Sequence, residues 1–179
     1  KGFGTKLLEA ELKQLFPNVK TARFDGDNKK DSDLASLYSA VKSGDIDILI
    51  GTQTLARGLD LPHLATVGII QADSGLTLPD FAAEERTFEL LTQVIGRVGR
   101  GHLDLADVIV QTYQPDHPVI QTALAADYPA FAEYLLQKRR SGQLPPYTYL
   151  ARLAITYKTE KTTVQKIQAA HSSLSQISG

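Results

Sequence analysis

The 179-residue chain contains no cysteine and no methionine. Without cysteine it can form neither disulfides nor thiolate metal sites, and no metal-ligand spacing stands out among its other residues. The same absence favours a reducing, intracellular setting. Because no starting methionine is present either, we expect the sequence to be a piece of a longer protein.

Long hydrophobic runs and a strong net charge are also missing. No apolar run approaches the roughly 20 residues of a membrane span, and the opening KGFGTKLLEA lacks the apolar region of a signal peptide. We therefore expect no membrane partner and a cytoplasmic location. The formal net charge is −1, whereas a chain that binds nucleic acid by bulk charge is strongly basic. Any contact with DNA or RNA would need a local patch or parts outside this sequence.

Four short apolar or β-branched runs alternate with helical patterns along the first two thirds of the chain. The runs are 19–25, 47–52, 66–72 and 107–113, and the helices are expected at 5–16, 32–44 and 80–97. Near-continuous apolar runs suit parallel strands that are covered on both faces. The alternation predicts an α/β fold with a doubly wound parallel sheet and right-handed crossovers.

The character of the sequence changes after residue 113. We expect helical structure over 117–141, a break at GQLPPY (142–147), a strand at LARLAITYK (150–158) and an amphipathic helix over 163–177. One strand and one helix cannot bury a core alone. The pattern predicts one domain over 1–143 and a truncated α+β domain over 144–179.

The stretch QVIGRVGRG (93–101) combines a glutamine, two arginines and three glycines. On a helix with about 100° per residue, Gln93, Arg97 and Arg100 share one stripe opposite the apolar side chains. Gly96 and Gly99 beside the stripe leave room for a bulky partner or let the helix end. Because arginine is suited to phosphate oxygens, the stripe is either a phosphate clamp or a solvated polar face with Arg–Glu pairs.

The stretch GTQTLARGLDLP (51–62) directly follows an expected strand. Ligands of open α/β sheets bind outside the carboxyl ends of the strands, and threonine hydroxyls and N–H groups there suit an anion. Gly58 permits close approach or a positive φ, and Asp60 can accept from a ribose hydroxyl or orient an arginine. The alternative interpretation is a helix cap and turn.

Together these strings resemble a known family. TQTLARGLD (52–60) and QVIGRVGR (93–100) are similar to motifs V and VI of superfamily 2 helicases. Longer strings over 72–101, 109–121 and 144–153 resemble the PriA family of replication-restart helicases. The resemblance implies a RecA-like parallel sheet flanked by helices, the second lobe of the helicase core.

The resemblance also implies roles for single residues. Gln93 would contact the γ-phosphate region of ATP, and Arg97 and Arg100 would stabilise charge on the transferring phosphoryl group, with Arg100 as the arginine finger. Gly58 and Asp60 would lie near the bound nucleotide.

On the DNA side, the resemblance implies contacts from Thr52, Gln53 and Arg57, with Thr52 at a backbone phosphate of the tracked strand. Asp73 is a further candidate, as a partner that orients an arginine of the second motif.

The implied activity is that of an ATP-dependent 3′–5′ DNA helicase in replication restart at stalled forks. Its partners would be single-stranded and forked DNA, primosome proteins and single-stranded-DNA-binding protein. ATP and Mg²⁺ would be shared with another lobe, because this chain has no G-x-x-x-x-G-K-[ST] phosphate loop. We therefore expect the chain to be inactive alone, and zinc to bind only elsewhere in the full-length protein.

Two alternatives to this function remain open. In the first, the chain comes from another superfamily 2 translocase, such as a RecG-like or repair helicase. It would otherwise be a non-catalytic RecA-like scaffold in which Arg97 and Arg100 bind DNA or protein.

The basic cluster YLLQKRRSG (134–142) is followed closely by PPYTY (145–149). Aromatic rings beside cations suit single-stranded DNA, whereas cations at a helix C-terminus are also favoured by the helix dipole. The acidic stretch RFDGDNKKDSD (23–33) is interpreted as a solvated loop rather than a metal site.

Overall fold

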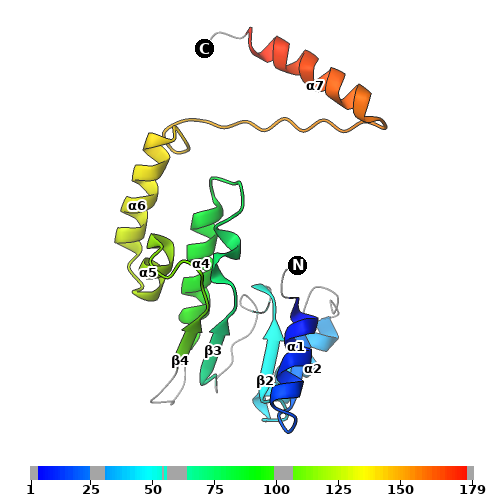
Figure 1. Cartoon of the computed structure of the whole chain (residues 1–179), viewed down its shortest axis with the longest axis vertical. Coiled ribbons are helices and arrows are strands. Elements are labelled where there is room, and N and C mark those ends of the chain that lie inside the picture. The colour runs from blue at the N-terminus through cyan, green and yellow to red at the C-terminus, as the bar shows by residue number, and fades with distance from the viewer. Residues whose placement is uncertain (1–3, 25–30, 54, 56–63, 99–106, 177–179) are drawn as a thin grey trace. The chain divides into compact units, whose positions relative to one another are not determined.

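The computed structural model describes residues 4–24, 31–53, 55, 64–98 and 107–176 (Figure 1). In chain order its elements are α1 (Thr5–Leu15), β1 (Thr21–Phe24), α2 (Asp31–Lys42), β2 (Ile48–Gly51), β3 (Thr66–Ile69), the 3₁₀ helix η1 (Ala72–Gly75), α4 (Ala83–Ile95), β4 (Asp107–Val110), α5 (Pro118–Leu124), α6 (Tyr128–Ser141) and α7 (Glu160–Leu174). The chain divides into two compact units, Lys1–Lys138 and Arg139–Gly179.

Strands β1 and β2 pair in parallel, with Thr21 opposite Ile48 and Phe24 opposite Gly51. Helix α1 packs on this pair. A partly buried ion pair of 3.1 Å between Arg23 Nε of β1 and Glu9 Oε2 of α1 adds a polar link. The inner residues of the pair, Phe24 and Ile50, are buried.

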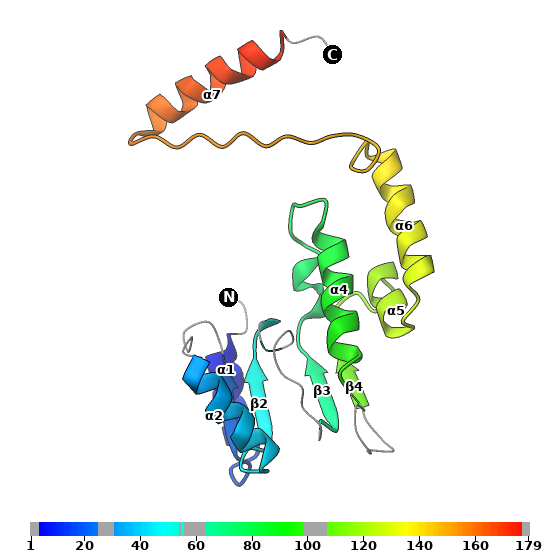
Figure 2. The ribbon, with the colours of Figure 1, turned by 180° about the vertical axis from the view of Figure 1, so that it is seen from behind.

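Strands β3 and β4 form a second parallel pair, with Thr66 opposite Asp107 and Ile69 opposite Val110. Helix α4 lies along this pair in both views (Figures 1 and 2). Ile69 and Val110 pack against a buried cluster that η1, α4, α5 and α6 supply. Its members are Ala72, Phe88, Leu91, Val119, Ile120, Ala123, Phe131 and Leu135.

The parallel α/β architecture confirms the prediction from the sequence. Each of the four strands expected before residue 114 is present, and both pairings are parallel. The described strands nevertheless pair two by two, as β1–β2 and β3–β4, rather than in one continuous sheet. The chain between these pairs runs partly through residues 56–63, which are outside the described part.

The helical structure expected over 117–141 is confirmed as α5 and α6, with a break between them that the sequence did not predict. Ala126 has a positive φ of 52°, which no residue of an α-helix adopts. Asp127 then begins the next helix, since its Oδ1 accepts from the N–H of Ala130 at 3.0 Å. The break lets α6 turn back, so that the Phe131 ring stacks on Phe88 with centroids 3.8 Å apart.

The second unit contains the end of α6, a turn, an extended segment and α7. The strand predicted over 150–158 is wrong: residues 149–157 have no regular secondary structure, and within the described residues no strand pairs with them. A strand needs a neighbour for its N–H and C=O groups. The predicted helix is confirmed as α7, which begins where Thr159 Oγ1 accepts from Thr162 N–H at 3.3 Å.

The assignment of 144–179 to a truncated second domain stays a prediction. Among the described helices, none combines the length and the apolar character that crossing a membrane requires.

Candidate functional site

The first motif along the chain, GTQTLARGLDLP (51–62), begins at the carboxyl end of β2. Gly51 closes the strand, and the chain then turns so that Leu55 N–H donates to Thr52 C=O at 2.9 Å. A Cβ on Gly51 would lie 2.7 Å from Leu55 Cδ2 and 2.9 Å from the Phe24 carbonyl oxygen. Glycine is therefore required for the turn to fold back onto the strand. Thr52 and Gln53 are exposed there, as a ligand contact at a strand end requires.

The rest of that motif lies beyond the described part of the chain. Arg57, Gly58 and Asp60 fall in 56–63, and Arg100 falls in 99–106. Their predicted roles stay predictions.

The second motif, QVIGRVGRG (93–101), begins in the last turn of α4, and the start of this helix is fixed by local chemistry. Asp80 Oδ1 accepts from the N–H of Ala82 at 2.9 Å, and the other Asp80 oxygen pairs with Arg86. Glu84 and Glu85 occupy the first turn, where negative charge is favourable. Phe88 and Leu91 of the apolar face are buried, as the sequence predicts, while Gln93 is exposed.

Helix α4 ends at Ile95, so it does not continue to Arg97 as predicted, and Arg100 lies outside the described residues. Gly96 is the C-cap. The next N–H groups bond three residues back: Arg97 to Val94 C=O at 3.1 Å and Val98 to Ile95 C=O at 3.2 Å. These tighter turns replace the α-helical pattern. Arg97 is thus carried on a turn after the helix, where it is half-buried.

The structure groups two of the described candidate residues here. Gln93 lies in the last turn of α4, and Arg97 follows Gly96 directly. Gln93 also lines an open hollow together with Glu89, Leu90 and Thr92. A Cβ on Gly96 would come within 3.1 Å of the Thr92 carbonyl oxygen, so a glycine at this position keeps the helix end compact.

Asp73 has a structural position that the sequence did not reveal. Its carboxylate is buried and accepts from the Thr112 hydroxyl, from Tyr113 N–H at 2.9 Å and from Gln114 N–H at 3.3 Å. Burial raises the pKa of this carboxyl, but these hydrogen bonds outweigh burial and hold the pKa below its usual value. Asp73 anchors the segment after β4 to η1; its predicted contact with an arginine stays a prediction.

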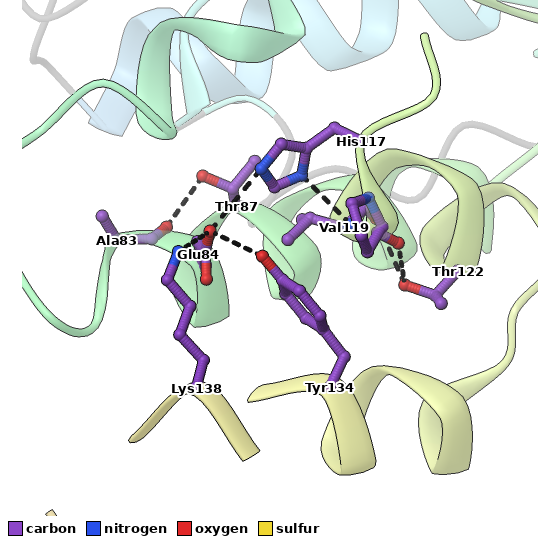
Figure 3. A network of polar contacts seen from close by, with 9 residues as sticks. Ala83, Glu84, Thr87, His117, Val119, Thr122, Tyr134 and Lys138 are labelled. Carbon is purple, nitrogen blue, oxygen red and sulfur yellow. Dashed lines mark hydrogen bonds and ion pairs between the residues drawn. The ribbon is translucent and has the colours of Figure 1, made fainter. Parts of the chain in front are cut away.

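A second polar cluster joins α4, α5 and α6 (Figure 3). Glu84 Oε1 accepts from Lys138 Nζ at 2.7 Å and from the Tyr134 hydroxyl at 3.1 Å, and His117 Nε2 lies 3.6 Å away. His117 also caps α5, because its Nδ1 accepts from Val119 N–H at 3.2 Å. Sequence reasoning missed Glu84, since its partners on α6 are 50 and 54 residues away.

The cluster changes the pKa of two of its members. Burial, and next the negative charge of Glu84, raise the pKa of the Tyr134 hydroxyl. The hydrogen bond to Glu84 is the main cause that raises the pKa of Lys138. Both shifts keep the protonated forms that donate to Glu84.

The predicted basic cluster over 134–142 is therefore divided in the structure. Tyr134 and Lys138 point into the Glu84 cluster. Arg140 belongs to the second unit, and its guanidinium lies 5.1 Å from the ring centroid of Tyr147.

A known protein family matches the part of the chain that carries these residues. The model of the "Helicase conserved C-terminal domain" matches residues 4–102, which include both motifs and the whole of α4. The chain belongs to this family. Its short parallel strands flanked by helices agree with a RecA-like helicase lobe, as the sequence predicts.

The chain is similar to curated proteins named "Replication restart protein PriA". It is 41% identical to that of Bacillus subtilis over 172 residues, which cover 95% of this chain and 21% of the relative. It is 41% identical to that of Haemophilus influenzae over 176 residues, 98% of this chain and 22% of the relative. It is 38% identical to that of Treponema pallidum over 173 residues, which cover 97% of this chain and 26% of the relative.

The chain thus spans about a fifth to a quarter of the length of these relatives. The predicted resemblance to the PriA family of replication-restart helicases is confirmed by these identities across nearly all of the chain.

Proposed function

We propose that this chain is the second RecA-like lobe of an ATP-dependent DNA helicase that moves 3′ to 5′ and acts in replication restart at stalled forks. The observation that carries the proposal is the helicase match over residues 4–102, because it spans both motif segments. The names of the relatives, replication restart proteins, support the process.

The proposed ATP contacts come from the end of α4 and from the first motif. Gln93 would contact the γ-phosphate region, and Arg97 and Arg100 would neutralise charge that builds up on the transferring phosphoryl group. Gly58 and Asp60 would lie near the nucleotide. The exposure of Gln93 supports this proposal, as does the placement of Arg97 on a turn directly after the helix. Mg²⁺ would be held mainly by the other lobe and would neutralise charge on the phosphates of ATP.

The proposed DNA contacts are Thr52, Gln53 and Arg57. Thr52 and Gln53 are exposed after the carboxyl end of β2, the side of a parallel sheet where ligands bind. The Gly51 turn fixes where this segment leaves the strand.

The complete reaction would need a second lobe, because this sequence has no phosphate-loop motif. We therefore expect no ATP hydrolysis by the 179-residue chain alone. In the full-length protein we propose a zinc site that lies outside this chain. Its partners would be single-stranded and forked DNA, primosome proteins and single-stranded-DNA-binding protein. Its location would be cytoplasmic.

The test is DNA-stimulated ATP hydrolysis by the full-length protein, native against Arg100→Ala. We expect turnover to fall by about 10³-fold or more while the affinity for single-stranded DNA stays within about twofold. Arg86→Ala is the matched control, because Arg86 is an exposed arginine paired with Asp80 at the other end of α4.

Two results would contradict the proposal. Unchanged turnover in Arg100→Ala would remove the arginine-finger role. Loss of DNA affinity with normal basal turnover would mean that the motif faces DNA or a protein partner, as in the scaffold alternative.

A further inference from the structure

The two units of the chain carry opposite charge. Residues 139–179 contain six lysines and arginines and a single acid, Glu160, whereas residues 1–138 contain 13 basic and 19 acidic residues. The formal charges are therefore +5 and −6, although the whole chain is at −1. Such an asymmetry between parts of one chain is typical of binding to a polyanion.

The cations of the second unit are available to a ligand. Arg140, Arg152, Lys158 and Lys161 are exposed. The structure shows no ion pair for these four side chains among the residues it describes. Two of them, Arg152 and Lys158, lie between the end of α6 and the start of α7, where Figure 1 shows an extended segment. Their charges are not compensated within the unit.

An ordered turn after α6 adds aromatic rings to this charge. Leu144 N–H donates to Arg139 C=O at 2.8 Å, and Tyr147 N–H donates to Leu144 C=O at 3.0 Å. These bonds fold the chain back, so that the Arg140 guanidinium lies over the Tyr147 ring, 5.1 Å from its centroid. Tyr147 remains 44% exposed, and Tyr149 is fully exposed.

Rings beside uncompensated cations match one class of ligand best. Single-stranded nucleic acid offers unpaired bases that stack on aromatic rings and phosphates that attract arginine and lysine. In a duplex the base faces are stacked on one another and only the phosphates and groove edges are accessible.

We propose that the turn Arg140–Tyr149 is a base-stacking contact for single-stranded DNA. Tyr147 stacks on a base, Arg140 holds the ring from its other side, and Arg152, Lys158 and Lys161 contact backbone phosphates. This contact is separate from the one proposed for Thr52, Gln53 and Arg57 and requires no ATP, so it goes beyond the proposed function.

The test measures the affinity of the full-length protein for a labelled 20-nucleotide oligo-dT by fluorescence polarisation, without nucleotide and at several salt concentrations. Tyr147→Leu keeps apolar bulk but removes the ring, and we expect it to weaken binding about tenfold. Arg152→Gln removes one phosphate contact, and we expect the slope of log K against log salt to fall by about 0.7.

Matched controls come from the first unit. Tyr113→Leu alters a tyrosine that is 82% exposed, and Arg86→Gln alters an exposed arginine. We expect both to bind oligo-dT within about twofold of the native protein. Thermal unfolding of all four variants checks that the fold is retained.

A second measurement localises the contact. Irradiation of the complex with an oligonucleotide that carries 5-bromodeoxyuridine should crosslink the peptide containing Tyr147 or Tyr149, as identified by mass spectrometry. A crosslink confined to peptides of the first unit would overturn the proposal.

The remaining outcomes distinguish other ligands. Equal affinities of Tyr147→Leu and Tyr113→Leu for oligo-dT would overturn the stacking role. If Tyr147→Leu weakened binding to duplex DNA or to phosphatidylserine vesicles as much as to oligo-dT, the turn would be a general anion surface and the single-strand assignment would be wrong. None of these binding and crosslinking measurements uses ATP. A failure of the arginine-finger test would therefore leave the stacking proposal unaffected.

Discussion

At the scale of single residues, Gly51 is a position where a methyl group is not accommodated. We expect Gly51→Ala to destabilise the 179-residue chain by about 1–3 kcal/mol, because the new Cβ would lie within 2.9 Å of both Leu55 and the Phe24 carbonyl. Urea unfolding followed by circular dichroism measures this. Gly68→Ala in β3 is the control, because a Cβ there meets nothing within 4 Å. Equal midpoints for the two variants would contradict the account of the turn.

Asp73 predicts how the stability of the fold changes at acidic pH. Its folded-state pKa lies below the usual value of 3.8, so the ionised carboxylate stabilises the fold above that pH. The stabilisation is lost as pH falls below 3.8 towards the folded-state pKa. We expect the urea midpoint of the native chain to drop between pH 5 and pH 2.5 by more than that of Asp73→Asn. Asp116→Asn, at an exposed position, should retain the native pH dependence.

At the scale of elements, the attachment of α6 to α4 rests on an apolar and a polar contact. We expect Phe131→Ala to cost about 3–5 kcal/mol of unfolding free energy, because Phe131 is 3% exposed and stacks on Phe88. Leu136→Ala, at a residue that is 40% exposed on the same helix, should cost much less. Similar losses in both variants would mean that the stack does not hold α6.

The sequence predicted most elements, because their signals are local. The alternation of apolar runs located β1 to β4, and the helical pattern over 5–16 located α1. The break at Ala126 was missed, since alanine is the strongest helix former and carries no stop signal. The end of α4 at Ile95 was also missed, because the apolar period continues through Val98 while Gly96 ends the helix.

Of the candidate site, the sequence predicted the placement of Thr52 and Gln53 after a strand and of Gln93 on an exposed helix face. It could not predict the Asp73 and Glu84 clusters. Their partners, Thr112 and Lys138, are 39 and 54 residues away along the chain, and only the packed fold brings them together.

At the scale of the whole molecule, the division into two units predicts where proteases act. Residues 149–157 have no regular secondary structure and include exposed Arg152, and exposed Lys158 follows them. We expect brief trypsin treatment to cut first at these two positions, whereas Lys13 within α1 should be protected. Mass spectrometry of the early products measures this. The larger early product should have a lower isoelectric point than the intact chain, because the removed part is basic. Isoelectric focusing measures this difference. Early cleavage at Lys13 would contradict the division.

The contacts that attach α6 to α4 have a consequence for how these positions evolve. Glu84 depends on Tyr134 and Lys138, and Phe88 depends on Phe131, so a substitution at one partner changes which residues the other can tolerate. Among relatives, positions 84 and 138 should vary as a pair, with loss of the carboxylate accompanied by loss of the ammonium. A lineage that replaced either one alone would lose the ion pair that joins α4 and α6, and selection would favour a second change at the far end of the same contact.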